Sequence, residues 1–229
     1  MPDLQQLFTN IAPTYDKLNR WLSFSRDRRW RTHAIGAITP RLSFRVLDLC
    51  AGTLDMSVAM LRRFPQATIT CVDFSAKMLE LGMRKVPHVF QRQVETRCED
   101  AMRFAFPDHS FDVVLCAFGM RNLPDQVRAL QQIRRVLEPN GELVILEFFQ
   151  PTTTAARWFG RTYGRYIIPL LGGLLSKQRP AYEYLRDSTA AFYPLSAYRA
   201  LLRQHGFHVR VAEELSGGVA SLIVAEPNG

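Results

Sequence analysis

The stretch VLDLCAGTLD, Val46–Asp55, decides how the rest of the chain is interpreted. An apolar run ends in the small-residue turn Ala51-Gly52-Thr53, and the helical pattern MSVAMLRRF follows it. This order predicts a buried strand, a tight turn, and a helix whose N-terminus faces the turn. Because glycine has no Cβ, a ligand can approach the backbone of such a turn closely.

An acidic residue ends the second predicted strand, TITCVDF, at Asp73, about 20 residues after Gly52. An acid at this position can bind ribose hydroxyls. A dinucleotide site needs several glycines for the pyrophosphate, but here Leu54 stands where another glycine is expected. The pattern therefore favours S-adenosylmethionine, which has no phosphate, although any α/β domain can carry a glycine turn after a strand.

The composition is that of a folded globular protein: 229 residues, 47% hydrophobic and 22% charged. The net charge of +8 indicates an acidic partner, which could be nucleic acid, an anionic membrane surface or an acidic substrate. The N-terminus, MPDLQQLFTN, does not have the pattern of a signal peptide. No run reaches the roughly 20 apolar residues of a membrane span.

Cysteine use agrees with a reducing, cytoplasmic compartment. The chain has four cysteines far apart in apolar, strand-like runs: Cys50, Cys71, Cys98 and Cys116. We expect them to be buried core residues and not a disulfide framework or a zinc site. No other cluster predicts a metal ion.

Residues 1–229 are predicted to form one α/β domain with a doubly wound, mostly parallel sheet of seven strands. Strand and helix patterns alternate over the cofactor-binding core, 45–149. Residues 1–44 predict N-terminal helices, and 150–190 predict a helical cap insertion before the last two strands. Residues 191–229 predict a helix and a closing antiparallel hairpin, because the link Ser216-Gly217-Gly218 is short.

Local signals fix several boundaries inside this pattern. Ser75 and Asp125 are predicted N-caps of two helices. Residues 138–141, EPNG, predict a turn before the fifth strand. The third and weakest strand pattern, QVETRCEDA, is expected to end at Asp100.

The N-terminal segment combines aromatic and basic residues. We expect an aromatic face to pack on the domain through Trp21, Phe24, Trp30 and Ile35. Next to it lies a basic patch, Arg26, Arg28, Arg29 and Arg31, against a single acid. The patch is interpreted either as a solvated helix face or as an interfacial or lid segment.

Residues 151–180 contain no acid but several arginines, including Arg157, Arg161 and Arg165, interleaved with aromatic side chains. The run IIPLLGGLL within them is too short to span a bilayer. An ordinary cap over a substrate cleft, contact with an anionic membrane, and RNA binding all suit this composition.

Four motifs resemble one family. IAPTYDKLN, AFGMRNLPD, RVLEPNGELVILEFFQP and YEYLRDS are similar to those of the ubiquinone/menaquinone biosynthesis C-methyltransferases, which are class I S-adenosylmethionine-dependent methyltransferases with a Rossmann-like fold. The similarity runs from about Phe8 to Val224. It implies C-methylation of the ring of a prenylated quinol such as demethylmenaquinol, an enzyme without a metal ion, and peripheral contact with the inner face of an anionic membrane. Nucleic acid is not expected as a partner, and a homodimer stays open.

The resemblance also implies a cofactor site. It places Thr53 at the amino acid end of S-adenosylmethionine, Asp73 at the ribose and Asp100 beside the adenine. Tyr15 would cover the cofactor, and Ala117 stands where relatives carry serine. The full set of expected cofactor-binding residues is Tyr15, Gly52, Thr53, Asp73, Asp100, Ala101 and Ala117.

Arg121 and Asn122 are the catalytic candidates. Arginine is too basic to act as a simple general base, but it can stabilise a phenolate or position a water that takes the proton. Asn122 can hold the hydroxyl. The structural alternative is that Arg121 pairs with an acid such as Asp125 while Asn122 caps a turn. Tyr182 and Asp187 either line the quinone pocket or anchor the insertion.

Two departures from the family pattern leave alternatives open. The turn reads GTLD where relatives have GTGD, and leucine at a left-handed position would cost about 1 kcal/mol or more. Lys177 stands where relatives carry an acid, which bears on the substrate. The alternatives are a methyltransferase of another phenolic, lipid or natural-product substrate, and a non-catalytic binding protein with a degenerate cofactor site.

Overall fold

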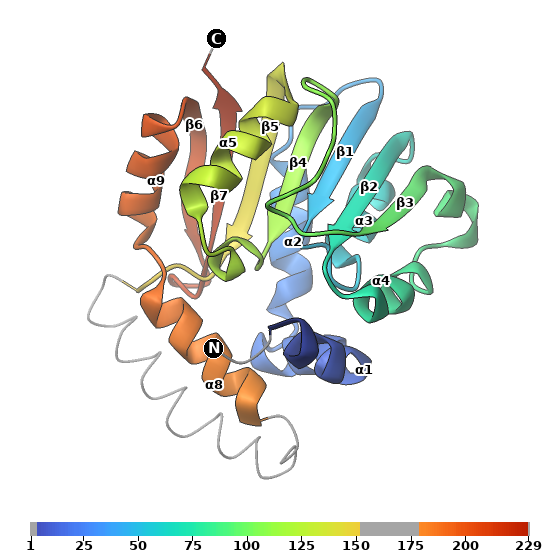
Figure 1. Ribbon diagram of the computed structural model, residues 1–229, viewed down its shortest axis with the longest axis vertical. Helices are drawn as coiled ribbons and strands as arrows, with labels where there is room; N and C mark the ends of the chain where they lie inside the picture. The colour runs from blue at the N-terminus through green and yellow to red at the C-terminus, as the bar shows by residue number, and fades with distance from the viewer. Residues whose placement is uncertain (1–3, 152–178, 229) are drawn as a thin grey trace.

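A computed structural model describes residues 4–151 and 179–228 (Figure 1). Its centre is a seven-stranded sheet in the order β3-β2-β1-β4-β5-β7-β6. The strands are β1 Phe44–Leu49, β2 Ala67–Asp73, β3 Val94–Cys98, β4 Phe111–Ala117, β5 Leu137–Glu147, β6 Phe207–Leu215 and β7 Ala220–Pro227. Neighbours among β1 to β5 pair in parallel, and β7 is antiparallel to both β5 and β6. The predicted sheet and closing hairpin are confirmed.

Helices cover both faces of the sheet, which explains why β4 is apolar along nearly its whole length. Helices α2, α3 and α4 pack on one face, and α5 and α9 on the other (Figure 1). Helices α1 and α8 lie across the carboxyl ends of the parallel strands (Figure 1). The bounds are α1 Leu4–Leu22, α2 Arg26–Gly36, α3 Asp55–Arg63, α4 Ala76–Met83, α5 Gln126–Val136, α8 Arg179–Ala191 and α9 Leu195–Gln204, with short 3-10 helices η1 His88–Gln93 and η2 Met120–Asn122.

The predicted helix caps are confirmed. The Ser75 side chain accepts a hydrogen bond from Met78 N at 3.4 Å, and the Asp125 side chain accepts one from Arg128 N at 2.9 Å. These bonds satisfy amide groups that the first turn of a helix leaves without partners.

Two boundaries differ from the sequence prediction. Strand β3 ends at Cys98, before Asp100. The turn expected at residues 138–141 lies inside β5, where the pairing with β4 shifts from Leu137 opposite Phe111 to Glu142 opposite Val113. The turn residues bulge out of the ladder there without ending the strand.

The N-terminal aromatic residues divide into two groups. Trp30 and Ile35 of α2 are buried, at 5% and 1% exposure, as predicted. Trp21 and Phe24 are 55% and 68% exposed, so the prediction that they pack on the domain is wrong. Arg31 is buried and therefore does not belong to the exposed basic patch.

The cysteines are free thiols, and no group of three His, Cys, Asp or Glu among the described residues could hold a metal ion. Cys71 and Cys116 are buried and Cys50 is half-buried. Cys98 is exposed, against the prediction, because β3 is an edge strand. Within the described ranges, no helix is long and apolar enough to cross a membrane. Arg157, Arg161, Arg165 and Lys177 lie outside the described residues.

Candidate active site

A pocket with about 350 Å³ of empty space, part of it open to solvent, lies at the carboxyl ends of β1, β2 and β4, against α1. It contains five of the expected site residues, Tyr15, Gly52, Asp73, Ala117 and Asn122. The complete lining is Phe8, Tyr15, Cys50, Gly52, Asp73, Phe74, Met78, Ala117, Phe118, Gly119 and Asn122. Segments far apart in the sequence therefore meet where ligands bind in open α/β sheets.

Asp73 supports the glycine turn directly. Its Oδ2 accepts a hydrogen bond from Gly52 N at 2.9 Å, and its Oδ1 accepts one from Ser75 N at 2.9 Å. Burial raises the pKa of Asp73, while these two backbone bonds act in the opposite direction. Each carboxylate oxygen keeps a further lone pair for a ligand. Gly52 has a φ of +53°, and a Cβ built there would meet only the Cys50 carbonyl oxygen, at 4.0 Å. The space over the turn is therefore open to a ligand.

Leu54 adopts the left-handed conformation, with a φ of 61°. The backbone at Leu54 therefore carries the strain that was expected for a leucine in the left-handed conformation. Its side chain is fully buried, and a Cβ added to Gly82 of α4 would lie only 2.4 Å from Leu54 Cδ1. The missing side chain of Gly82 makes room for Leu54, so its burial offsets the backbone strain. Leu54 N still donates to Ala51 O at 2.9 Å, and the turn keeps its shape.

Thr53 connects the turn to α1. Its Oγ1 donates a 2.6 Å hydrogen bond to Asp16 Oδ1. Lys85 Nζ bridges Asp16 and Asp55, at 2.8 Å and 2.5 Å. Burial acts to raise the pKa of Asp16, but hydrogen bonds from Lys85 and Thr53 lower it overall. Thr53 is 3% exposed and not part of the pocket lining. Asp16 and Lys85 were not singled out from the sequence, although Asp16 follows Tyr15 in the IAPTYDKLN motif.

Asp100 and Ala101 follow the end of β3, outside the pocket lining. Asp100 is exposed, and its Oδ1 accepts a hydrogen bond from Met102 N at 2.8 Å. Ala101 is buried in the core cluster that includes α5. Their contact with the adenine stays a prediction.

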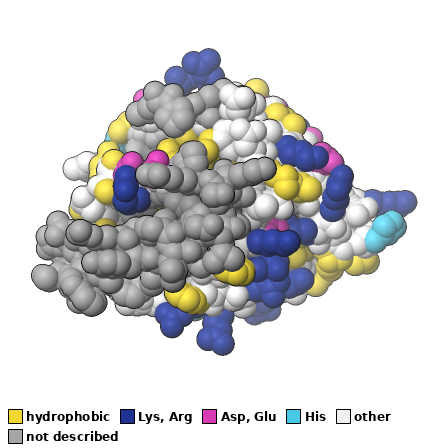
Figure 2. All heavy atoms as spheres, turned by 90° about the horizontal axis from the view of Figure 1, so that it is seen from below, with side chains coloured by type: hydrophobic (Ala, Val, Ile, Leu, Met, Phe, Trp, Pro, Cys, Tyr) yellow, Lys and Arg dark blue, Asp and Glu magenta, His cyan; other side chains and the backbone are white. Residues whose placement is uncertain are grey.

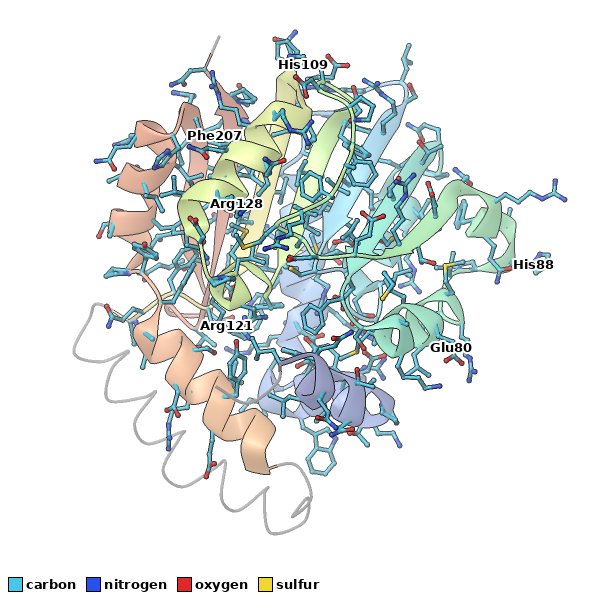
Figure 3. The ribbon with its side chains drawn as sticks, in the orientation of Figure 1. Glu80, His88, His109, Arg121, Arg128 and Phe207 are labelled. Carbon is cyan, nitrogen blue, oxygen red and sulfur yellow. The ribbon has the colours of Figure 1, made fainter. Side chains whose placement is uncertain are left out.

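Arg121 lies in η2, where its guanidinium points into the protein (Figure 3). Its Nη1 donates to Glu147 Oε1 at 2.6 Å and to Phe118 O at 2.7 Å, and its Nε donates to Ser188 Oγ at 3.3 Å. The Glu147 side chain is fully buried at the end of β5. Arg121 therefore does pair with an acid, but with Glu147, while Asp125 caps α5.

Asn122 is held by α8. The Tyr184 hydroxyl donates to Asn122 Oδ1 at 2.8 Å, and Asn122 Nδ2 donates to Phe118 O at 3.4 Å. Burial raises the pKa of Tyr184, so its hydroxyl stays protonated and donates. The Tyr184 ring also lies edge-on to Phe8 of α1, with the centroids 6.2 Å apart. Tyr184, the second tyrosine of YEYLRDS, thus joins the two helices over the pocket.

The two expected substrate-binding residues also belong to α8. The Tyr182 side chain lies outside the described residues. Asp187 is exposed and forms a 2.7 Å ion pair with Arg186. It does not line the pocket, so its role at the substrate rests on the family resemblance.

The chemistry of the lining fits S-adenosylmethionine. Among the described residues, the lining holds no Lys, Arg or His that would bind phosphate. It offers one carboxylate, Asp73, and the rings of Phe8, Tyr15, Phe74 and Phe118. Aromatic faces attract cations and stack on flat rings, which suits both a sulfonium and an adenine.

Comparisons with known proteins agree. The sequence matches the ubiE/COQ5 methyltransferase family over residues 2–226. It is 41% identical to a demethylmenaquinone methyltransferase of Thermus thermophilus, over 96% of this chain and 99% of the relative. It is 37% identical to a ubiquinone/menaquinone biosynthesis C-methyltransferase, UbiE, of Geotalea uraniireducens, over 97% and 95%.

Solved structures support the fold. A chain from the complex between the Haloferax volcanii Trm112 methyltransferase activator and a putative methyltransferase is similar with a TM-score of 0.72, at 15% identity, over 97% of this chain and 98% of that one. An S-adenosylmethionine-dependent methyltransferase from Aquifex aeolicus is similar with a TM-score of 0.58, at 16% identity, over 80% and 81%.

Proposed function

The chain belongs to the ubiE/COQ5 methyltransferase family, and we propose that it transfers a methyl group from S-adenosylmethionine to a ring carbon of a prenylated quinol such as demethylmenaquinol. The names of the relatives from Thermus thermophilus and Geotalea uraniireducens support this substrate class. The observation that carries the proposal is the pocket, which joins the glycine turn and Asp73 to the loop of Arg121 and Asn122.

The residues around the glycine turn would hold the cofactor. S-adenosylmethionine, when bound, supplies an electrophilic methyl group. Gly52 leaves the backbone accessible, Asp73 can accept from the ribose hydroxyls, and Tyr15 and Ala117 complete the lining. Thr53, Asp100 and Ala101 are assigned to the cofactor by family resemblance.

The substrate side of the pocket would favour the ionised quinol. A ring oxygen that loses its proton donates electron density to the adjacent unsubstituted carbon, which makes that carbon nucleophilic. Asn122, fixed by Tyr184, can bind this oxygen. The guanidinium of Arg121 can stabilise the negative charge from behind. The ring proton leaves after methylation, and the ring regains its aromaticity. Tyr182 and Asp187 are assigned to the quinol by resemblance.

A quinol with a prenyl tail partitions into a membrane. We therefore expect the protein to work in the cytoplasm, peripherally at the inner face of the membrane, with α1, which contributes Phe8 and Tyr15 to the pocket lining, turned toward the lipid.

The test is methyl transfer to reduced demethylmenaquinol, read by mass spectrometry. Wild type should add one methyl group to a ring carbon. Arg121→Lys keeps the charge but loses the forked geometry, and it should lower kcat by about 10²-fold. Arg128→Lys makes the same change on the exposed face of α5, so it is the matched control and should leave kcat unaffected (Figure 3). Transfer to a small soluble phenol, with none to the quinol, would contradict the proposed substrate.

Cofactor binding is tested separately by calorimetry with S-adenosylmethionine. Asp73→Asn keeps the size of the side chain but weakens its hydrogen bonds to Gly52 N and to a ribose. Wild type should bind, and the variant should bind at least tenfold more weakly. Equal binding would show that Asp73 does not contact the ribose.

A further inference from the structure

Two large apolar side chains are exposed at the junction of α1 and α2. Trp21 is 55% and Phe24 68% exposed, although most other aromatic residues of the described chain are at least partly buried. We define the N-terminal hairpin as residues 17–29, the last turns of α1, the junction, and the first turn of α2. The exposed pair lies at its tip, where no function described so far makes use of it.

The hairpin tip is a defined structure. Phe24 and Ser25 have φ values of 50° and 59°, in the left-handed region that residues other than glycine rarely adopt. Backbone hydrogen bonds fix this bend, from Ser25 N to Arg20 O at 2.7 Å and from Arg26 N to Ser23 O at 3.0 Å. A strained but well-bonded turn that presents an aromatic ring outward suggests a contact made by the ring.

The charge around the two rings has one sign. The hairpin carries exposed cations at five positions: Lys17, Arg20, Arg26, Arg28 and Arg29. Its one acid, Asp27, is buried at 4% exposure. It accepts hydrogen bonds from Ser23 Oγ at 2.9 Å and from Arg31 Nη1 at 2.6 Å. The hairpin therefore presents cations and aromatic rings without an exposed carboxylate. Figure 2 shows the lower face of the molecule, on which Lys and Arg side chains lie beside hydrophobic ones.

We propose that the N-terminal hairpin docks on an anionic lipid bilayer, with Trp21 and Phe24 in the headgroup region and the cations against the lipid phosphates. Tryptophan is enriched at membrane interfaces, and clustered Lys and Arg side chains are attracted to anionic leaflets. The reason for docking rests on the proposed function, because a prenylated quinol has to be taken from a membrane.

The same helix connects the hairpin to the pocket. Phe8 and Tyr15 of α1 line the pocket, and Trp21 follows Tyr15 by six residues, or about 9 Å along a helix. A bilayer in contact with the hairpin tip would therefore lie close to the pocket.

The experiment is cosedimentation of the full chain with vesicles of phosphatidylcholine, with and without phosphatidylglycerol. Wild type should bind the vesicles that contain phosphatidylglycerol, and added salt should weaken binding. Trp21→Ser/Phe24→Ser and, separately, Arg28→Glu/Arg29→Glu should each weaken binding at least tenfold. Circular dichroism checks that each variant is folded.

Matched controls lie at the opposite, amino end of the parallel strands. Leu42 and Val89 are 97% and 76% exposed, shortly before β1 and β3. The Leu42→Ser/Val89→Ser variant removes comparable exposed apolar surface. Arg62 and Arg63 are exposed in the last turn of α3, and Arg62→Glu/Arg63→Glu makes the same charge change as the hairpin pair. Both control variants should bind vesicles as wild type does.

The outcomes separate this inference from the proposed function. The inference is wrong if wild type ignores the anionic vesicles, or if the hairpin and control variants lose binding equally. Salt-dependent binding to RNA instead of vesicles, lost in the arginine variant, would assign the hairpin to nucleic acid and also overturn it. A water-soluble quinol without a tail tests chemistry alone, and the hairpin variants should methylate it at the wild-type rate. Vesicle binding without any quinol methylation would refute the function and leave the docking surface standing.

Discussion

Leu54→Gly separates the strain in the glycine turn from the packing that offsets it. Glycine adopts a φ of 61° freely, so the substitution should recover about 1–2 kcal/mol of left-handed strain. It also removes a fully buried leucine, and buried leucine truncations cost about 2–5 kcal/mol. Glycine also gives the unfolded chain more conformational freedom, which adds about 0.4–1 kcal/mol to the loss of stability. The net prediction is a loss of about 0.4–5 kcal/mol in the free energy of unfolding.

Leu54→Ala is the internal control. Alanine loses nearly the same packing but keeps the Cβ that makes the left-handed conformation unfavourable. In urea unfolding, wild type should therefore be the most stable, Leu54→Gly intermediate and Leu54→Ala the least stable. At an ordinary helical position, alanine would be more stable than glycine by about 1 kcal/mol.

Two results would refute this reasoning. A Leu54→Gly variant as stable as wild type would mean that the contact with Gly82 contributes nothing. An alanine variant more stable than the glycine variant would mean that the backbone at Leu54 is not left-handed in solution. Calorimetry with S-adenosylmethionine on the same proteins should show wild-type binding, because Leu54 faces α4 and not the pocket.

Three further predictions concern buried polar groups. Burial raises the pKa of Asp48 to about 7 from 3.8, so its stabilising contribution is complete below pH 3.8 and is lost as the pH rises to about 7. Asp48→Asn should therefore gain stability relative to wild type as the pH rises from 3.8 to about 7, by up to about 1.4 kcal/mol per pH unit in urea unfolding. A difference that does not vary with pH would contradict this. Glu147→Gln leaves the buried Arg121 without its charged partner, and should lower the free energy of unfolding by about 3–5 kcal/mol in the same assay. A loss below about 1 kcal/mol would show that the ion pair is dispensable. Tyr184→Phe removes the hydrogen bond that holds Asn122, and should lower kcat for the quinol. Binding of S-adenosylmethionine, measured by calorimetry, should stay unchanged. An unaltered kcat would show that the position of Asn122 does not matter for catalysis.

The sheet and its order of elements could be predicted because they depend on short-range patterns. Apolar runs such as FDVVLCAF, and caps such as Ser75 and Asp125, carry their signal within a few residues. The pocket followed from the same patterns, because the carboxyl ends of parallel strands must meet along one edge of the sheet.

The errors arise where the sequence leaves a long-range partner unspecified. The room for Leu54 is made by Gly82, on another helix. The partner of Arg121 is Glu147, which the sequence presents as one acid at the end of an apolar strand. Trp21 and Phe24 were expected to be buried because large apolar residues usually are, yet the local sequence at the end of α1 and in the junction after it does not state which side faces the domain.

The edge position of Cys98 makes it a natural labelling site. Of the four cysteines, Cys98 is exposed, Cys50 is half-buried and the other two are buried, so a thiol-reactive fluorophore should attach to Cys98 selectively. Cys98 Sγ lies 3.5 Å from Phe74 O, and that carbonyl also accepts a hydrogen bond from Gln5 of α1, at 2.8 Å. Because Phe74 lines the pocket, a dye at Cys98 would sit beside both the wall of the pocket and the helix that covers it. Its emission would report how α1 moves as ligands enter and leave, without any engineered residue.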